Sequence, residues 1–429
     1  MKSFTWLSAC VIAGSLAGGP VWGQPAAAPG GPQAAPLATP GPSTASVTLR
    51  AALDAAWQRA VVARESDGQR RRAEADRSAA TSLWAAPPSL EVSHRNDRLH
   101  NNTGQRETEI GVAVPLWLPG QRAARLSTAD AAAARAAAAE QVGRLQLAGE
   151  LRAAAWQLAA MQAEVAQADS QVQALRQLAD DVERRVRAGD LARADALAAR
   201  AEQLASSALQ SDVRQRLQAA RARWALLTGL TTSPDVTAAA IVEAAPATTS
   251  GMGAPHPEQQ LARISTELAR KRVDQMRLSR RDAPELTVGL RQDVSGRSEV
   301  SQGSLVVGLR LPFGTDDRNR PLEAAALAEL DVAQTHERRL LERLDSDTTA
   351  ARDAQRSAEA QLDAETSRAR LLRERATLIE KSFRAGETPL PDLLRALADA
   401  SQADSAAARQ NAALGLARAH LQQTLGLLP

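Results

Sequence analysis

The feature that most constrains this chain is a proline-free stretch, residues 121–186, whose apolar side chains recur every seven positions. Its only glycines are Gly143 and Gly149. Two rows of mostly apolar residues, three positions apart, run along it: Leu151, Leu158, Val165, Val172, Ala179 and Val186, and Ala154, Met161, Ala168, Leu175 and Val182. Such a repeat over about five heptads specifies a left-handed coiled coil, because one seam keeps facing a partner helix. A helix of roughly 65 residues would be about 100 Å long, so the stretch predicts an elongated helical protein.

The first 46 residues are not expected to belong to the folded core. A short basic start, an apolar run and a small-residue cleavage site are typical of a secretory signal peptide over residues 1–23. Residues 24–46 are rich in proline, alanine and glycine, which predicts a disordered leader. Cys10 is the only cysteine, and it either leaves with the signal peptide or lies in a lipoprotein cleavage box and carries a lipid. In the first case the mature chain has no cysteine for a disulfide or a thiolate metal site.

Composition excludes several classes of function. The formal net charge is +3, acidic and basic residues are interspersed along the helical stretches, and aromatic residues make up only 2% of the chain. A nucleic-acid partner is therefore not expected. The five histidines are scattered, and no Ser/His/Asp, metal-ligand or phosphate-loop spacing occurs. We expect no enzyme, no cofactor and no metal site.

Each half of the chain contains two alternating apolar runs joined by a polar, turn-rich loop, the pattern of a β-hairpin. The hairpins are expected at residues 88–117 and 284–312. A helix is expected before each hairpin (49–84 and 258–281), and a long helix after it (121–186 and 319–385). A glycine turn then leads into a shorter helix, 190–228 and 389–427.

This order of elements indicates an internal duplication. Five matched pairs of glycines, prolines and aspartates are each separated by 197 positions: Gly111 and Gly308, Pro115 and Pro312, Gly189 and Gly386, Asp195 and Asp392, and Gly229 and Gly426. Compositional similarity between alanine-rich helices would not align prolines and glycines in this way. The predicted repeats are residues 47–230 and 258–429, joined by a linker at 231–257.

The predicted strands have the length and alternation of membrane-spanning β-strands. Trp84, Trp117 and Phe313 stand where strands meet helices, as in an aromatic belt at a membrane interface. The alternative is a small periplasmic sheet packed on helices. Four strands cannot close a barrel, and an open sheet edge is not viable in lipid, so several copies would have to share one barrel. Two copies would give a filled eight-stranded barrel, and three would give twelve strands with room for a channel.

The ordered motifs resemble the TolC family of outer-membrane efflux channels across almost all of the mature sequence. The segments that carry the resemblance are TLRAAL (48–53), GVAVPLWLPGQR (111–122), GLRLPFG (308–314), FRAGETPLPDLL (383–394), LLTG (226–229) and LG (425–426). The resemblance implies a homotrimer in which a twelve-stranded outer-membrane β-barrel continues into a periplasmic α-helical barrel. It also implies docking on a periplasmic adaptor and an inner-membrane pump. The segment that leads from the strand to the long helix and contains Trp117 is most similar to the same segment in channels of heavy-metal (cobalt–zinc–cadmium type) efflux systems with RND pumps.

The resemblance also implies two sites near the glycine turns. The adaptor would dock on the tips, at Arg187, Gly189, Asp190, Arg384, Gly386, Glu387 and Thr388. The alternative for these residues is that they are only solvated turn residues. The periplasmic gate would comprise Asp195, Phe383, Asp392 and Arg395.

Three copies of Asp392 around a narrow axis would favour cations. The chain departs from the family pattern at two gate positions. Arg395 stands where a further acidic residue would be expected and can pair with Asp392. Phe383 replaces a tyrosine whose hydroxyl could latch the gate.

We therefore expect a protein of the outer membrane of a Gram-negative bacterium, with a large periplasmic portion, that serves as a passive exit duct for heavy-metal cations. Two alternatives stay open. The same channel could export organic drugs or solvents, or the chain could be a periplasmic coiled-coil adaptor or scaffold. That second class would show one helical hairpin flanked by small β-domains, not a duplicated unit of hairpins and strand pairs.

Overall fold

The computed structural model describes residues 47–429, apart from residues 101, 233, 235 and 237–254. The predicted signal peptide with Cys10, the predicted leader and most of the predicted linker lie outside the described residues. All the helices and strands belong to one unit of the chain, Ser46–Pro429.

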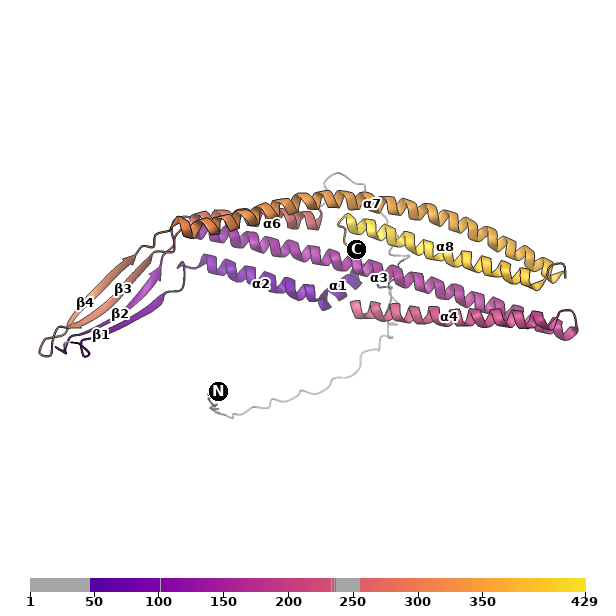
Figure 1. Cartoon of the computed structure of the whole chain (residues 1–429), viewed down its shortest axis with the longest axis horizontal. Coiled ribbons are helices and arrows are strands. Elements are labelled where there is room, and N and C mark those ends of the chain that lie inside the picture. Colours follow the sequence, from indigo (N-terminus) through magenta and orange to yellow (C-terminus); the bar gives the residue numbers. More distant parts are fainter. Residues whose placement is uncertain (1–46, 101, 233, 235, 237–254) are drawn as a thin grey trace, which may run out of the picture. The chain divides into compact units, whose positions relative to one another are not determined.

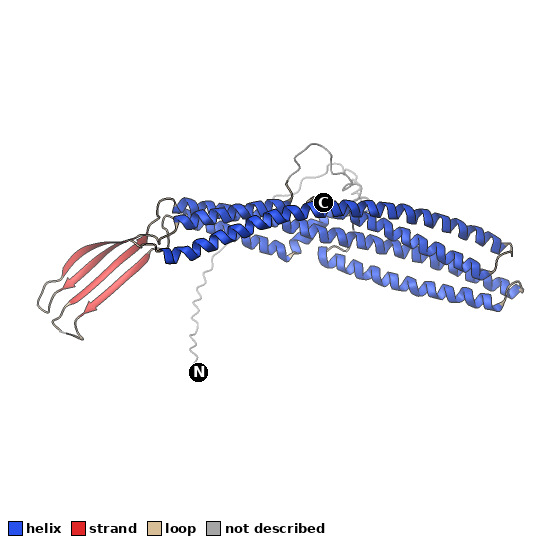
Figure 2. Cartoon of the chain, turned by 45° about the horizontal axis from the view of Figure 1, so that its top comes forward, coloured by secondary structure: helices blue, strands red, loops and turns tan. Residues whose placement is uncertain are grey.

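The chain is mainly helical with one small sheet, which confirms the predicted fold class (Figures 1 and 2). The first half contains α1 (Leu49–Arg59), α2 (Val61–Thr81), β1 (Ser89–Asn96), β2 (Arg106–Pro115), α3 (Gln121–Ala188) and α4 (Arg193–Thr228). The second half contains α6 (Pro257–Leu278), β3 (Glu285–Val294), β4 (Gln302–Arg310), α7 (Asp316–Arg384) and α8 (Leu390–Thr424). The second half thus repeats the first, and the long helices α3 and α7 have 68 and 69 residues.

The prediction of a single helix before the first hairpin was wrong. The backbone is extended at Ala60 (φ −67°, ψ 137°), which separates α1 from α2. Side chains on both sides of the break pack on Gly143 of α3, where an added Cβ would lie 2.8 Å from Val62 Cγ1 and 3.5 Å from Trp57 Cη2. Packing on a distant helix therefore accompanies the break, and no local proline or glycine marks it.

Helix α3 is the centre of the helical part. It packs against α2 and α6 in the half near the sheet and against α4 and α8 in the half near the turns (Figure 1). Leu151 and Leu158 of the first predicted row are buried, and further along Ala168, Leu175 and Val182 of the second row are buried together with Ala179 of the first. The second row thus joins the buried seam as the partner helices change. No helix among the described residues carries an apolar stretch long enough to cross a bilayer.

The four strands form one antiparallel sheet in the order β1-β2-β3-β4, so the two hairpins join through β2 and β3. On one face the register lines up three rows of apolar residues: Leu90, Val112, Val288 and Val307; Val92, Ile110, Leu290 and Leu305; and Val114, Leu286 and Leu309. Leu290 is 70% exposed and Leu305 is 68% exposed. The helices of the described chain do not cover this face, so it is not the buried face of a self-contained sheet.

The two hairpins approach closely at a pair of glycines on the other face. Gly111 of β2 faces Gly289 of β3, and a Cβ added at Gly289 would lie 2.9 Å from Gly111 Cα and 2.9 Å from Ile110 O. Real Cβ atoms do not approach other atoms so closely, so any larger residue would push β2 and β3 apart.

We predict that Gly289→Ala destabilises the folded chain by about 1–3 kcal/mol, because the added methyl group overpacks the joint between the hairpins. Gly303→Ala in β4 is the matched control, since no atom lies within 4 Å of its added Cβ. Thermal unfolding in detergent measures both variants. Equal unfolding temperatures for the two variants would contradict the close approach of β2 and β3 at Gly289.

Near the middle of α3, a buried arginine binds the C-terminal end of the chain. Arg152 is 2% exposed, and its guanidinium donates to Gln423 Oε1 (2.8 Å) and to the carbonyl of Leu427 (3.0 Å). Gln423 in turn donates to the carbonyl of Leu145 (2.8 Å). These bonds fix α8, from the second repeat, against α3, from the first.

Candidate functional site

The two glycine turns lie at the ends of the long helices that are remote from the sheet (Figure 1). Gly189 (φ 85°) ends α3 and Gly386 (φ 79°) ends α7. At each turn the glycine N–H donates to a carbonyl three residues earlier, and the next N–H donates to one five residues earlier. This pair of hydrogen bonds needs a residue in the left-handed conformation, which glycine adopts without strain. The duplication therefore builds two equivalent tips.

Most of the predicted docking residues are exposed at these tips. Arg187, Asp190, Arg384 and Glu387 lie on the surface together with the two glycines. Thr388 is half-buried, and its hydroxyl donates to Ser382 Oγ (2.6 Å). Of the predicted docking residues, each tip thus presents one cationic and one anionic side chain, and the docking role stays a prediction.

The two tips are joined by a small hydrophobic core, which contains one of the predicted gate residues. Phe383 of α7 is 3% exposed and packs with Val182 of α3 and with Leu390 and Leu393 of α8. The guanidinium of Arg185 lies over the Phe383 ring, 5.2 Å from its centroid. Phe383 therefore holds the two helical hairpins of one chain together, a contact that sequence reasoning did not anticipate.

The matched aspartates make different contacts, although each lies in the first turn of its helix. Asp195 Oδ2 accepts a hydrogen bond from the N–H of Ala192 (3.2 Å) and so caps α4. The residue equivalent to Ala192 is Pro389, which has no N–H to donate. Asp392 is instead exposed and lies 3.5 Å from Arg395, the partner that the sequence predicted. Asp392 is thus the carboxylate of the pair that is not used in capping.

At the other end of the helices, the predicted belt residues flank the sheet. Trp117 donates from Nε1 to the carbonyl of Ser82 (3.1 Å), and the guanidinium of Arg125 lies 5.7 Å from its ring centroid. Trp84 is 36% exposed and Phe313 is 84% exposed. All three stand at the junctions of strands and helices, and their membrane role stays a prediction.

The face of the sheet opposite the apolar rows is polar, and sequence reasoning did not single out its ion pairs. Glu107 of β2 binds Arg291 of β3 (3.0 Å) and lies 3.9 Å from Arg95 of β1. Small residues, including Gly111 and Gly289, fill the same face nearer the helices. The alternation along each strand could have located this face, but the pairing needs the cross-strand register.

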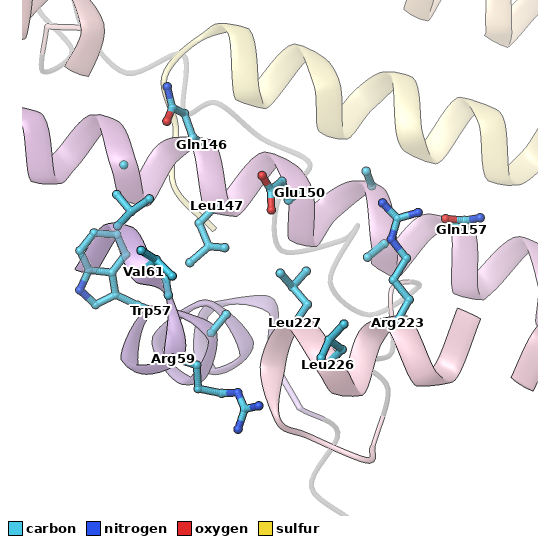
Figure 3. A pocket seen from close by; sticks show the side chains of 16 residues that line it. Trp57, Arg59, Val61, Gln146, Leu147, Glu150, Gln157, Arg223, Leu226 and Leu227 are labelled. Atoms are coloured by element: carbon cyan, nitrogen blue, oxygen red, sulfur yellow. The ribbon is translucent and has the colours of Figure 1, made fainter. Parts of the chain in front are cut away.

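A groove of about 760 Å³ lies beside the break between α1 and α2 (Figure 3). Leu147 of α3 and Leu226 and Leu227 of α4 line it together with Trp57 and Val61. Within the part of the chain that the structure describes, no group of three or more His, Cys, Asp or Glu side chains is placed to hold a metal ion. The groove itself is mainly apolar, and Arg59, Glu150 and Arg223 are the charged residues that line it.

No protein-family model and no curated protein matches the sequence. Solved structures do match. The outer membrane protein VceC from Vibrio cholerae is 15% identical, with a TM-score of 0.68 over 88% of this chain and 96% of that chain. CusC is 14% identical, with a TM-score of 0.70 over 89% and 93%. The MtrE outer membrane channel of Neisseria gonorrhoeae, in its open state, is 16% identical, with a TM-score of 0.64 over 89% of both chains.

At these identities the likeness establishes the fold. This chain has the fold of these outer-membrane proteins over almost nine-tenths of its length.

Proposed function

We propose that this protein belongs to the TolC family and is the outer-membrane channel of a tripartite efflux system. The observation that carries the proposal is the sheet. One face presents three apolar rows to the outside, and both outer strands, β1 and β4, have one unpaired edge among the described strands. Such a sheet is satisfied when copies pair edge to edge inside a membrane, where unpaired backbone groups are costly. The shared fold with outer-membrane channels supports the same conclusion.

The proposed assembly is a homotrimer. Three copies supply twelve strands, which leave an open lumen, whereas two copies supply eight and fill it with side chains. The polar face with Glu107 and Arg291 then lines the lumen, and the apolar rows face lipid. The long helices continue the wall into the periplasm for about 100 Å.

The tips are the proposed docking site for a periplasmic adaptor, which in turn binds an inner-membrane RND pump. Support comes from their position and from the exposed charges at Arg187, Asp190, Arg384 and Glu387. Three copies of Asp392 form the proposed periplasmic constriction, each partly neutralised by its own Arg395. A passive duct of this kind performs no chemistry.

Heavy-metal cations are the proposed cargo. The proposal rests on two points. The strand-to-helix segment with Trp117 resembles that of channels from heavy-metal systems, and a ring of Asp392 carboxylates would prefer cations. Organic drugs or solvents are the alternative cargo.

The cargo proposal predicts that deletion of the gene makes cells more sensitive to zinc, cobalt and cadmium than to organic dyes. The measurement is the growth-inhibitory concentration of each compound for deleted and complemented strains. Sensitivity to dyes alone would assign the channel to organic cargo.

The channel proposal predicts an outer-membrane protein that runs as a heat-labile trimer in detergent extracts. The rival class, a periplasmic coiled-coil scaffold, would be released with the soluble periplasm. Separation of the membranes, followed by electrophoresis of heated and unheated samples, distinguishes the two. Release of the full chain with soluble periplasm would refute the channel.

The gate proposal predicts that Asp392→Ala raises single-channel conductance in planar bilayers, because the smaller side chains widen the constriction. It also predicts a weaker cation preference, because the constriction loses its charged ring. Asp363→Ala, at an exposed position of α7 remote from the tip, is the matched control and is expected to leave both quantities unchanged. If Asp392→Ala also changes neither, Asp392 is not part of the constriction.

A further inference from the structure

The strands sort their charged side chains between the two faces of the sheet. Three of their four arginines lie on the polar face, each within 4 Å of a strand carboxylate: Arg95 and Arg291 approach Glu107, and Arg310 approaches Glu285. All five carboxylates of the described strands lie on that face: Glu91, Glu107, Glu109, Glu285 and Asp293. The face with the apolar rows therefore carries no negative charge within these strands.

The fourth arginine, Arg106, is the exception. It begins β2 and stands in register with Asn96 of β1 and Val294 of β3, on the face that carries the apolar rows. Arg106 is exposed, and no carboxylate among the described residues forms an ion pair with it. Its positive charge is thus not neutralised by the chain that the structure describes.

The carboxylate next to Asn96 in the sequence is occupied elsewhere. Asp97 Oδ2 accepts hydrogen bonds from the hydroxyl of Thr103 (2.6 Å) and from the N–H of Gly104 (3.0 Å), and so organises the loop between β1 and β2. Arg98 follows in the same loop and is exposed, and it too has no ion pair with a described carboxylate. This end of the sheet therefore offers two guanidinium groups without anionic partners.

A polar row separates Arg106 from the apolar rows. It contains His94, Thr108 and Gln292. His94 Nδ1 lies within hydrogen-bonding distance of Thr108 Oγ1 (2.9 Å), and Gln292 donates to Ser301 Oγ (2.7 Å). We call the five residues that cap the apolar rows the polar strip: His94, Asn96, Arg106, Thr108 and Gln292. The polar strip contains hydrogen-bonding groups and an arginine, but no carboxylate.

The polar strip lies at the end of the sheet remote from the helices (Figure 2). Arg106 is eight residues from Val114 of the last apolar row, which is about 27 Å along the strand and about 20 Å across the membrane at a strand tilt of roughly 40°. A charged side chain on the lipid face of a barrel is destabilising at mid-bilayer and tolerated at the interface. In the proposed channel the helices are periplasmic, so the polar strip stands at the level of the outer-leaflet headgroups.

We propose that the polar strip binds the phosphate groups of a glycolipid in the outer leaflet, with Arg106 as the main phosphate ligand and Arg98 as a second cation. Guanidinium groups bind phosphate through two parallel N–H donors, and an arginine without a carboxylate partner keeps these donors free. The acyl chains of the lipid then lie on the exposed apolar rows, which include Ile110 (52% exposed) and Leu290 (70% exposed).

A glycolipid suits the polar strip better than a phospholipid for two reasons. The outer leaflet of a Gram-negative outer membrane consists mainly of glycolipids that carry phosphates on a sugar core. The amides of Asn96 and Gln292 can also exchange hydrogen bonds with sugar hydroxyls beside the phosphate. The inference rests on the proposed outer-membrane channel and adds the lipid that its outer rim recognises.

Native mass spectrometry of the full-length protein in a neutral detergent, titrated with diphosphorylated lipid A, tests the site. Arg106→Gln is expected to weaken lipid A binding by about tenfold, because a charge-assisted contact with phosphate is lost. Arg106→Lys, which keeps the charge but not the two parallel donors, is expected to lose less. Arg263→Gln removes an exposed arginine of α6, in the helical part, and is the matched control with unchanged binding.

Two further ligands identify the chemistry that is recognised. Lipid A without its phosphates tests the charge, and phosphatidylglycerol tests the sugar core. Both are expected to bind the native protein more weakly than lipid A does. If phosphatidylglycerol binds as tightly as lipid A, the site does not recognise a glycolipid and the proposal is wrong.

Electrophoresis of unheated samples separates the possible failures. If native protein and Arg106→Gln both run as trimers and bind lipid A equally, the polar strip is not a lipid site, while the proposed channel stands. If the native protein is neither a trimer nor found in the outer membrane, the proposed function fails, and the lipid site fails with it.

Discussion

The unpaired backbone of β1 and β4 is the constraint on which the rest of this structure depends. Each outer strand offers N–H and C=O groups that no described strand of the same chain accepts, and the apolar rows beside them are open. In the proposed membrane position such groups would cost several kcal/mol each, so a single copy would be incomplete. The helical part also exposes large apolar side chains, including Leu204, Leu226 and Val332. One head-to-tail operation between copies would complete both parts at once.

The duplication explains why the two halves are similar without being equal. The ring of Trp156 in α3 covers Gly415 in α8, whereas the equivalent positions in the other repeat, 197 residues away, hold Asp353 and Gln218. The tips differ in the same way. Asp195 caps its helix, but Pro389 removes the N–H that Asp392 would bind, and this leaves the second carboxylate exposed.

Sequence patterns located most of the fold because the patterns are local. Heptads predicted α3, and left-handed glycines predicted the turns at Gly189 and Gly386. The break at Ala60 was missed because it coincides with packing on Gly143, more than 80 positions away in sequence. The burial of Phe383 was missed for a similar reason, since its neighbours come from three helices. For the candidate sites, the sequence predicted the Asp392–Arg395 pair from helical spacing, but it could not distinguish the roles of Asp195 and Asp392 without the caps.

The difference between the two kinds of seam follows from when each one forms. The seam inside the chain forms as the chain folds, and it can bury an arginine, Arg152, and the cluster around Phe383. A seam between copies must first exist as surface, so its apolar residues have to be spaced apart, because a large continuous apolar patch would aggregate. The leucines of α4 and α7 meet this requirement, as charged residues such as Arg200 and Glu374 separate them. In the proposed trimer, closing the ring would then depend on contacts spread along the helices and not on a single hydrophobic patch, which would favour the correct neighbour over other apolar surfaces.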